Sequence, residues 1–287
     1  MNTKTSSKEY ILHQGELLQA SQFKLPLASS RVLLGESIFT SFSSRLDVNS
    51  KLDLHLHKDR LDKGLKFLGL SSSLDFPHKN LEKDLALIKE EFPSEGLFYL
   101  RPTYLKRTDE SFVYFIVIRL EIPHPMTNLE HRLNCISQTK DRSVLDSEVK
   151  LSQYAETEFL KRVNPKADEI LFFDHMARLQ DSCTSNVVGF AKNKIIVPII
   201  SSGENFFQGI TVKELINFCE KNNREIVFKE IFYEELEFFD SLVLLNQVRG
   251  ARFIHRLDEI EFKNLESDLL FIKSFINESW KCGDLNE

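Results

Sequence analysis

The sequence predicts an α/β (α+β) protein of two domains, on the basis of three observations. Strand-like and helix-like segments alternate in both halves of the chain, with no internal repeat. The segment 122–130 (IPHPMTNLE) carries two prolines, which interrupt regular structure and suit a domain boundary. The chain of 287 residues is long enough for two medium-sized domains. We therefore expect a smaller N-terminal domain at 1–124 and a larger C-terminal domain at 125–287.

The first half begins with strands, followed by two helices and two further strands. HQG at 13–15 is typical of a turn, and the helices follow from leucines at helical spacing. SFVYFIVIRLEI is almost continuously apolar, which predicts a buried central strand. The expected elements are strands within 9–46, helices at 57–68 and 79–91, and strands at 96–107 and 111–122, joined near 108–110.

The second half alternates strands and helices again. The expected elements are a helix at 152–163, strands at 169–173, 186–191 and 195–199, a helix from Thr211, a strand at 225–231, a short helix at 233–238, strands at 241–246 and 251–262, and a helix at 265–280. In a protein of two such domains, a ligand site between them is the usual expectation.

The composition argues against several kinds of partner. The net charge of −6 is spread without long single-sign runs, which disfavours nucleic acid or an anionic membrane. No apolar run approaches the ~20 residues of a membrane span, and the N-terminus lacks the apolar core of a signal peptide. The cysteines form no C-x-x-C pair, which indicates a reducing cytoplasm, and no ligand spacing suggests a metal. They are Cys135, Cys183, Cys219 and Cys282.

Gly209-Ile210-Thr211 stands in front of an amphipathic helix pattern, in FFQGITVKELINFCEKN. The N–H groups at a helix N-terminus and the helix dipole favour an anion such as phosphate. However, Thr211 and Glu214 also form the Thr-x-x-Glu pattern of a capping box, which would satisfy these N–H groups without a ligand. These residues alone leave both interpretations open.

Two other segments hold residues that could carry chemistry. Lys150 lies where an extended stretch enters a helix, and uncharged residues follow it. A desolvated lysine is a nucleophile toward carbonyl groups, whereas a lysine at a strand end that reaches to water is the plainer alternative. Asp181 opens a predicted polar loop, DSCTSN, before a strand that turns back at 192–193. That loop fits a hairpin, or a carboxylate beneath a basic heteroaromatic nitrogen.

Six segments in this order resemble the class-IV aminotransferase family, the pyridoxal-phosphate (PLP) enzymes of fold type IV. The segments are HQGEL with RVLLGESIFTS, HLHKDRL, VKLSQYAETEFLKRVNPKADEILFFD, DSCTSN, QGIT and LLNQVRGARFI. The resemblance covers nearly the whole chain. It implies the two-domain fold-type IV architecture with the cofactor between the domains, and a homodimer.

The resemblance also implies roles for individual residues. Lys150 corresponds to the lysine that forms the Schiff base with PLP and then shuttles a proton. Arg60 corresponds to the arginine that holds the phosphate, and Ile210 and Thr211 to the pair that binds it through N–H groups and a hydroxyl. Asp181 takes the place of a glutamate that faces the pyridine nitrogen. The other expected site residues are Ser185, Asn186 and Gln247 for the cofactor, and Phe39, Thr40, Arg249 and Arg252 for the substrate.

The chain departs from the family pattern in several places. Asp181 is one methylene shorter than the usual glutamate, and Ser37 replaces the second glycine of the opening element. Gln247 stands where a serine or threonine usually helps to hold the phosphate, and residues 101–121 lack the usual Arg-Gly pair. If phosphate binds at Thr211, we expect Glu214 to turn away to solvent, because its carboxylate would compete for the same N–H groups.

The sequence leans toward aminodeoxychorismate lyase, which releases pyruvate and p-aminobenzoate. Thr40 stands where aminotransferases of this family more often have glutamate, and NQVRGARF resembles the lyase's Asn-x-x-x-Gly element. Arg249 or Arg252 could face a substrate carboxylate, with an exposed loop arginine as the alternative. An aminotransferase acting on branched-chain or D-amino acids, and a non-catalytic descendant with the same fold, stay open. We therefore expect an amino acid or aminodeoxychorismate as the small-molecule partner.

Overall fold

A computed structural model describes residues 9–25, 36–44, 54–70, 76–93, 96–107, 111–120, 129, 131–140, 149–152, 154–199 and 209–280. The chain forms two compact units. Unit 1 comprises Met1–Pro123 and Val149–Gln153, and unit 2 comprises His124–Glu148 and Tyr154–Glu287. The chain thus leaves unit 1 after Pro123 and returns to it briefly at 149–153. The sequence predicted a single boundary at 124–125 and did not predict this return.

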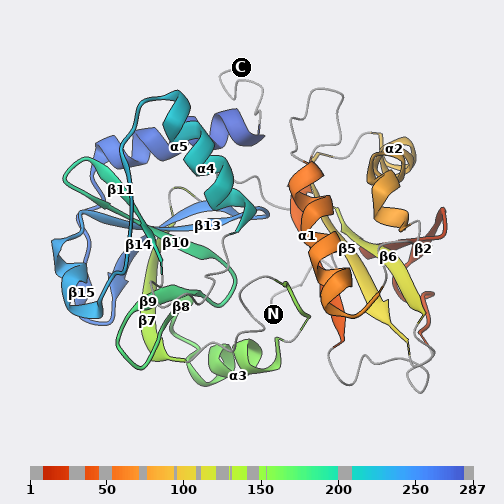
Figure 1. Ribbon diagram of the computed structural model, residues 1–287, viewed down its shortest axis with the longest axis horizontal. Coiled ribbons are helices and arrows are strands. Elements are labelled where there is room, and N and C mark those ends of the chain that lie inside the picture. Colours follow the sequence, from red (N-terminus) through yellow and green to blue (C-terminus); the bar gives the residue numbers. More distant parts are fainter. Residues whose placement is uncertain are drawn as a thin grey trace, which may run out of the picture. The chain divides into compact units, whose positions relative to one another are not determined.

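Unit 1 is built on an antiparallel sheet of six strands (Figure 1). Its strands are β1 (Glu9–His13), β2 (Glu16–Gln19), β3 (Ser37–Phe39), β4 (Phe42–Ser44), β5 (Phe98–Lys106) and β6 (Phe112–Arg119). The spatial order is β2-β1-β6-β5-β3, with β4 also paired to β5. The expected turn between β1 and β2 is confirmed: Gln14 and Gly15 have positive φ angles of 52° and 81°, as in a two-residue hairpin turn.

Strand β6 lies at the centre of this sheet, as predicted, but it is not buried on both faces. Its residues alternate between buried and partly exposed, with Ile116 and Ile118 fully buried. The helices α1 (Leu54–Phe67) and α2 (Leu81–Glu91), which a 3₁₀ turn η3 (Pro77–Asn80) precedes, pack on the same apolar cluster as these isoleucines. An antiparallel sheet covered on one face shows this alternation, so the run of apolar residues overstated the burial.

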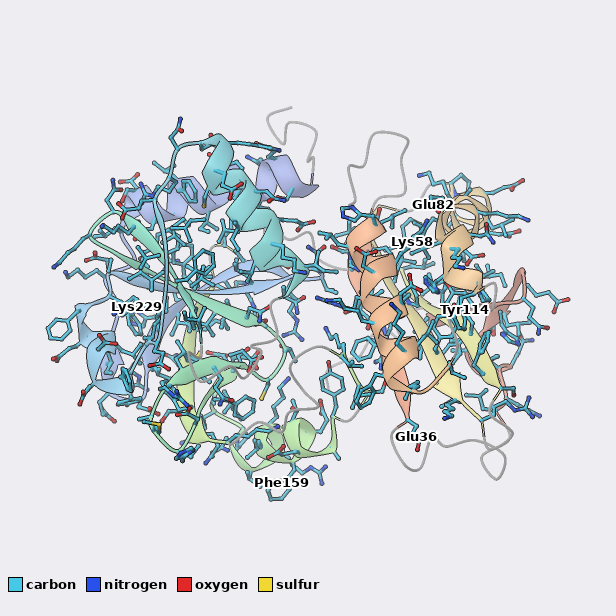
Figure 2. All side chains as sticks on the ribbon, in the orientation of Figure 1. Glu36, Lys58, Glu82, Tyr114, Phe159 and Lys229 are labelled. Carbon is cyan, nitrogen blue, oxygen red and sulfur yellow. The ribbon has the colours of Figure 1, made fainter. Side chains whose placement is uncertain are left out.

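Helix α1 lies close against β3 because a glycine faces the strand. A Cβ built on Gly64 would lie 2.6 Å from Cδ1 of Ile38. Glycine in a helix interior costs about 1 kcal/mol relative to alanine, so its presence at this contact has a packing reason. The helices are also joined at the surface, where Lys58 of α1 and Glu82 of α2 form an ion pair of 2.6 Å (Figure 2).

The returning segment 149–152 pairs with β3. Phe39 N–H donates to the Lys150 carbonyl at 3.1 Å, and Ser152 N–H donates to the Ser37 carbonyl at 3.0 Å. Ile38 and Leu151 form an antiparallel bridge between these two bonds. Lys150 is thereby held at the edge of the unit 1 sheet, beside the residues that α1 covers.

Unit 2 is built on a mixed sheet of nine strands (Figure 1). The strands are β7 (Arg132–Thr139), β8 (Glu169–Phe173), β9 (Leu179–Ser182), β10 (Asn186–Ala191), β11 (Lys194–Pro198), β12 (Ile226–Lys229), β13 (Ser241–Asn246), β14 (Gly250–Leu257) and β15 (Ile260–Glu261). The order is β12-β11-β10-β13-β14-β7-β8-β9, with β15 paired to β14. The sheet curls, since β9 at one end also contacts β10.

Both faces of this sheet are covered. Helices α4 (Ile210–Lys221) and α5 (Glu266–Trp280) lie side by side on one face, where Val243 and Leu245 join their apolar cluster (Figure 1). Leu242 and Leu244 point to the other face, together with the 3₁₀ turn η6 (Tyr233–Phe238). Strand β13 is apolar at successive positions because it is buried on both sides. A further helix, α3 (Ala155–Val163), packs near β8.

Most expected elements of unit 2 are present, with three differences. Strands β7 and β9 were not predicted, and the expected strand at 251–262 is a hairpin of β14 and β15. Asp181, expected to open a loop, lies within β9 opposite Phe172 of β8. The turn at Lys192 and Asn193 is confirmed, with φ angles of 49° and 64°. Among the described residues, no helix is long and apolar enough to cross a membrane.

Candidate active site

In unit 1, Lys150 and Arg101 lie against the same aromatic ring. The Lys150 Nζ atom is 4.9 Å from the centre of the Phe39 ring, and the Arg101 Cζ atom is 3.8 Å from it. Arg101 also donates from Nη2 to the Ser152 Oγ atom at 2.9 Å. An aromatic face attracts cations and holds a guanidinium in a fixed plane. Phe39 therefore contacts two positively charged groups, one on the returning segment and one on β5.

A buried histidine, His57, feels the charge of Lys150 and of Arg60 on α1. The side chains of His57 and Thr40 are fully buried, and the His57 Nδ1 and Thr40 Oγ1 atoms are 2.6 Å apart. Burial lowers the pKa of His57 well below its usual value, and the charges of Arg60 and Lys150 lower it further. The imidazole is therefore neutral. Because Arg60 lies one helical turn after His57 on α1, it shares the face of α1 that carries the imidazole.

In unit 2, helix α4 begins without a side-chain cap. Gly209 is its N-cap residue, in an extended conformation, and the N–H groups of Val212 and Lys213 donate to the Gly209 carbonyl at 3.1 and 3.2 Å. The alternative of a capping box between Thr211 and Glu214 is wrong, because the N-cap residue is Gly209, two residues before Thr211. Thr211 instead lies in the first turn, where free N–H groups and the helix dipole attract an anion.

Glycine at position 209 leaves space for an amide side chain beside the helix start. A Cβ on Gly209 would lie 1.8 Å from the Oδ1 atom of Asn186, which no adjustment of a few tenths of an ångström could relieve. Asn186, at the start of β10, is therefore seated directly against the N-terminus of α4. Gly209 and Asn186 come from segments that were both expected to contact the cofactor.

Glu214 and Gln247 contact each other. The Gln247 Nε2 amide donates to the Glu214 Oε2 atom. The expectation that Glu214 faces solvent is wrong, because Glu214 is half-buried and accepts this hydrogen bond from the turn between β13 and β14.

The DSCTSN segment is a tight connection between β9 and β10. Ser182 Oγ donates to the Ser185 carbonyl at 2.9 Å and accepts the Ser185 N–H at 3.0 Å, which closes the turn. Asp181 and Ser185 are buried, with exposed fractions of 5% and 6%. Asn246 donates from Nδ2 to the Thr184 carbonyl at 2.6 Å, so the Asn-x-x-x-Gly element is tied to this connection.

The two arginines of that element differ in their surroundings. Arg249 is exposed in the turn, whereas Arg252 on β14 is buried. Arg252 Nη2 lies 3.2 Å from the Glu169 Oε2 atom and 3.4 Å from the Ser185 Oγ atom. The alternative of an exposed loop arginine is therefore wrong for Arg252, which forms a buried ion pair next to an expected cofactor residue.

Comparison with known proteins gives the family. A family model described as "Amino-transferase class IV" matches residues 37–257. The chain belongs to this family. The match confirms the enzyme class that the sequence motifs indicate, a PLP-dependent aminotransferase or lyase. No curated protein matches the chain.

Several solved structures share the fold of this class IV aminotransferase family member. A PLP-bound hypothetical aminotransferase from Mycobacterium tuberculosis has 15% identity and a TM-score of 0.81, with 95% of this chain and 98% of that chain covered. A branched-chain aminotransferase from Thermoproteus uzoniensis has 13% identity and a TM-score of 0.80, with 95% of each chain covered. A putative 4-amino-4-deoxychorismate lyase from Legionella pneumophila has 18% identity and a TM-score of 0.76, with 90% and 96% covered. The fold-type IV architecture is thus confirmed.

The residues of both units suit the groups of PLP. Unit 2 offers a helix start at Gly209, a hydroxyl on Thr211 and a glycine that admits the Asn186 amide. Unit 1 offers a lysine and, on α1, an arginine whose charges both act on His57. The departure at Gln247 changes one contact, because its amide donates to Glu214. Within the described part of the chain, no group of three or more His, Cys, Asp or Glu could hold a metal ion.

Three residues of these groups escaped the sequence analysis. Arg101, His57 and Glu169 were not singled out, although each contacts or lies beside an expected site residue. The sequence could have indicated Arg101, since a charged residue inside an apolar strand needs a partner. It could not have indicated His57 or Glu169, because their partners are distant in sequence.

Proposed function

We propose that Lys150 is the catalytic residue of a PLP-dependent reaction on a substrate that carries an amino group and a carboxylate. The observation that carries the proposal is the position of Lys150. Backbone bonds hold it to β3, and its Nζ atom lies against the Phe39 ring, which Arg101 also contacts. When bound, PLP supplies an electron sink that stabilises negative charge on the carbon next to the amino group. Lys150 Nζ would hold the cofactor, and the same amine would move the proton at that carbon.

The remaining roles follow from charge and hydrogen bonding. Arg60 and the first turn of α4, with Ile210 and Thr211, would bind the phosphate, since a guanidinium and helix N–H groups both favour this anion. Asp181 would face the pyridine nitrogen as a carboxylate, accept its N–H hydrogen bond and keep that nitrogen protonated. Ser185 and Asn186 support the same part of unit 2, and Gln247 acts through Glu214. Arg101 presents a guanidinium that suits a substrate carboxylate.

We propose aminodeoxychorismate lyase as the first candidate reaction. Its support is the Asn-x-x-x-Gly element, which Asn246 ties to the cofactor segment through Thr184. The threonine at position 40, which the sequence also takes as a sign of the lyase, supports it only indirectly. Thr40 is fully buried against His57, and Phe39 is only 2% exposed. The second candidate is an amino-acid aminotransferase, which the half-buried Arg101 also suits. We further propose a homodimer in the cytoplasm, on the family resemblance and the cysteine pattern.

Borohydride trapping tests the role of Lys150. Purified protein with added PLP is reduced with borohydride, and the modified peptide is located by mass spectrometry. We expect the label on Lys150, its loss in Lys150→Ala, and its retention in the control Lys58→Ala. Turnover should fall at least about 10²-fold in Lys150→Ala, as expected when a proton-transferring group is removed. Wild-type protein that binds PLP without a trapped Lys150 would contradict the proposal.

Pyruvate release distinguishes the two candidate reactions. Aminodeoxychorismate is supplied without a keto acid, and pyruvate and p-aminobenzoate are measured. A lyase forms both products under these conditions. A requirement for a keto-acid acceptor would rule out the lyase and leave the aminotransferase.

A further inference from the structure

A buried hydrogen bond between His57 of helix α1 and Thr40, which follows strand β3, connects two parts of unit 1 that carry different functional residues. The His57 Nδ1 and Thr40 Oγ1 atoms lie 2.6 Å apart, and both side chains are fully buried. Helix α1 carries Arg60, the residue proposed to bind the phosphate. The end of β3 holds Lys150, whose carbonyl accepts the Phe39 N–H at 3.1 Å.

The surroundings of this bond determine which group donates the proton. Burial, and then the charges of Arg60 and Lys150, lower the pKa of His57 well below its usual value, so the imidazole is neutral and has one N–H. Among the described residues, neither the Thr40 hydroxyl nor Nε2 of His57 has another polar partner. A hydroxyl that accepted from Nδ1 would leave both its own proton and Nε2 unpaired. The Thr40 hydroxyl therefore donates to Nδ1, and Nε2 carries the proton of the ring.

Packing alone does not account for a histidine at position 57. Its Nε2 atom is buried without a hydrogen-bond partner in the part of the chain that the structure describes, and a buried N–H without an acceptor destabilises a fold. The imidazole lies against the ring of Phe42, with 4.5 Å between the ring centres, so an apolar side chain could fill this space without that loss. What the imidazole adds to packing is its directional bond to Thr40.

Thr40 is also fixed through its backbone. Its N–H donates to a carbonyl of β5 at 3.1 Å, and the preceding residue, Phe39, pairs with Lys150 and lies with its ring centre 4.9 Å from the Lys150 Nζ atom. On the helix, Arg60 follows His57 by about one turn, so a shift of α1 along the strand moves both residues together. The bond between His57 and Thr40 thus fixes α1 relative to the segment that holds Lys150.

We propose that His57 is a positioning residue of the cofactor site, which sets Arg60 and Lys150 at the spacing that lets one PLP molecule reach both. It acts through the Thr40 hydroxyl. This role rests on the proposed functions of Lys150 and Arg60. When two groups hold the two ends of one ligand, the second contact forms at a high effective concentration only if their spacing is right. Loss of the spacing therefore weakens a ligand that carries both the aldehyde and the phosphate, and spares one that carries the aldehyde alone.

Comparison of PLP with pyridoxal, which lacks the phosphate, tests this role. Each compound is titrated into the full-length protein, binding is followed by absorbance, and the bound form is trapped with borohydride. Thr40→Val removes the hydroxyl and keeps the size of the side chain. We expect it to weaken PLP binding about tenfold and pyridoxal binding less than about twofold. Thr40→Ser, which keeps a hydroxyl, should retain the PLP affinity of the wild type.

A variant on the other side of the bond separates positioning from a general loss of packing. His57→Leu should weaken PLP binding as Thr40→Val does, and the double variant should lose no more, because two residues that act through one contact are not additive. Losses that add, PLP and pyridoxal weakened alike, or wild-type PLP affinity in Thr40→Val would each overturn the positioning role. Trapping of PLP on Lys150 of the wild type shows that such a result leaves the proposed function intact, whereas PLP bound without a trapped Lys150 overturns both.

Discussion

The two units present their proposed functional residues in opposite ways. Unit 1 holds Lys150 beside its edge strand β3 and Arg101 on β5, both half-buried and in contact with the Phe39 ring. Unit 2 holds its residues in the interior, where Asp181 and Arg252 are 5% and 6% exposed and are fixed by strand pairing or an ion pair. Charges near water cost little to keep, whereas buried ones depend on their partners. Replacements in unit 1 should therefore affect chemistry more than stability, and replacements in unit 2 the reverse.

The largest expected effect on stability comes from Arg252. Its replacement by methionine leaves Glu169, whose side chain is fully buried, without its cation. Removing one partner of a buried ion pair typically costs about 3–5 kcal/mol of unfolding free energy. The measurement is urea denaturation of Arg252→Met and of the surface control Lys58→Met, whose pair with Glu82 is exposed and should be worth less than about 1 kcal/mol.

A double variant sharpens the comparison. Glu169→Leu combined with Arg252→Met leaves no unpaired charge, so most of the lost stability should return. If Arg252→Met alone unfolds as easily as Lys58→Met, the buried pair does not stabilise unit 2 and the contrast between the units fails. Thr184, which also donates to Glu169 Oε2 at 3.0 Å, would then be the group that keeps this carboxylate in place.

Two glycines give the next largest effect, one in each unit. A Cβ on Gly189 of β10 would lie 2.3 Å from the Phe239 ring, whereas on Gly64 it would meet the flexible end of Ile38 at 2.6 Å. A rigid ring cannot give way, so Gly189→Ala should lose about 1–3 kcal/mol of unfolding free energy. In Gly64→Ala the clash is smaller, and alanine also favours the helical conformation over glycine by up to about 1 kcal/mol, which offsets part of the cost.

Thermal and urea denaturation of the two alanine variants decide this point. Gly189→Ala should unfold at a clearly lower midpoint than Gly64→Ala. Equal midpoints would mean that Phe239 can repack and that the interior of unit 2 is no stiffer than the α1 contact of unit 1.

The sequence predicted elements well where local pattern and burial agree. Strand β13 and helix α4 were expected because their apolar residues follow the spacing of a strand buried on both sides and of an amphipathic helix. Strand β7 was missed because only two of its residues, Leu133 and Cys135, are buried, and their neighbours are polar, so the strand has no long apolar pattern. Its partners β14 and β8 are parallel and remote in sequence, so its pairing leaves no local signal.

The candidate site shows the same limit. The family motifs indicated Lys150, Arg60 and Thr211, and their roles stay predictions until the cofactor is trapped. The contacts around them depend on tertiary structure. The capping-box pattern at Thr211 lost to an earlier helix start at Gly209, and Arg101 reaches Phe39 only because 149–152 pairs with β3.

The smallest expected effect concerns a buried acid in unit 1. Asp84 has a pKa near 6 in the folded chain, above the ~3.9 of an unfolded aspartate. Between these values the folded state binds more protons, so the contribution of Asp84 to stability falls as the pH rises from about 4 to 6 and stays low above 6. Asp84→Asn removes this cost and keeps an acceptor for Tyr114. After allowance for partial solvent exposure, it should stabilise the protein by about 1 kcal/mol at pH 7 and by nothing at pH 4.

Urea midpoints of wild type, Asp84→Asn and the surface control Asp59→Asn at both pH values measure this difference. Asp268 of unit 2 is the internal comparison, because burial raises its pKa too, but Ser241 donates to it at 2.8 Å and Arg224 lies 3.9 Å away. Because these partners offset part of the cost of burial, Asp268→Asn should gain less stability at pH 7 than Asp84→Asn. If Asp84→Asn gains no more than Asp268→Asn, the surroundings of Asp84 already satisfy its charge.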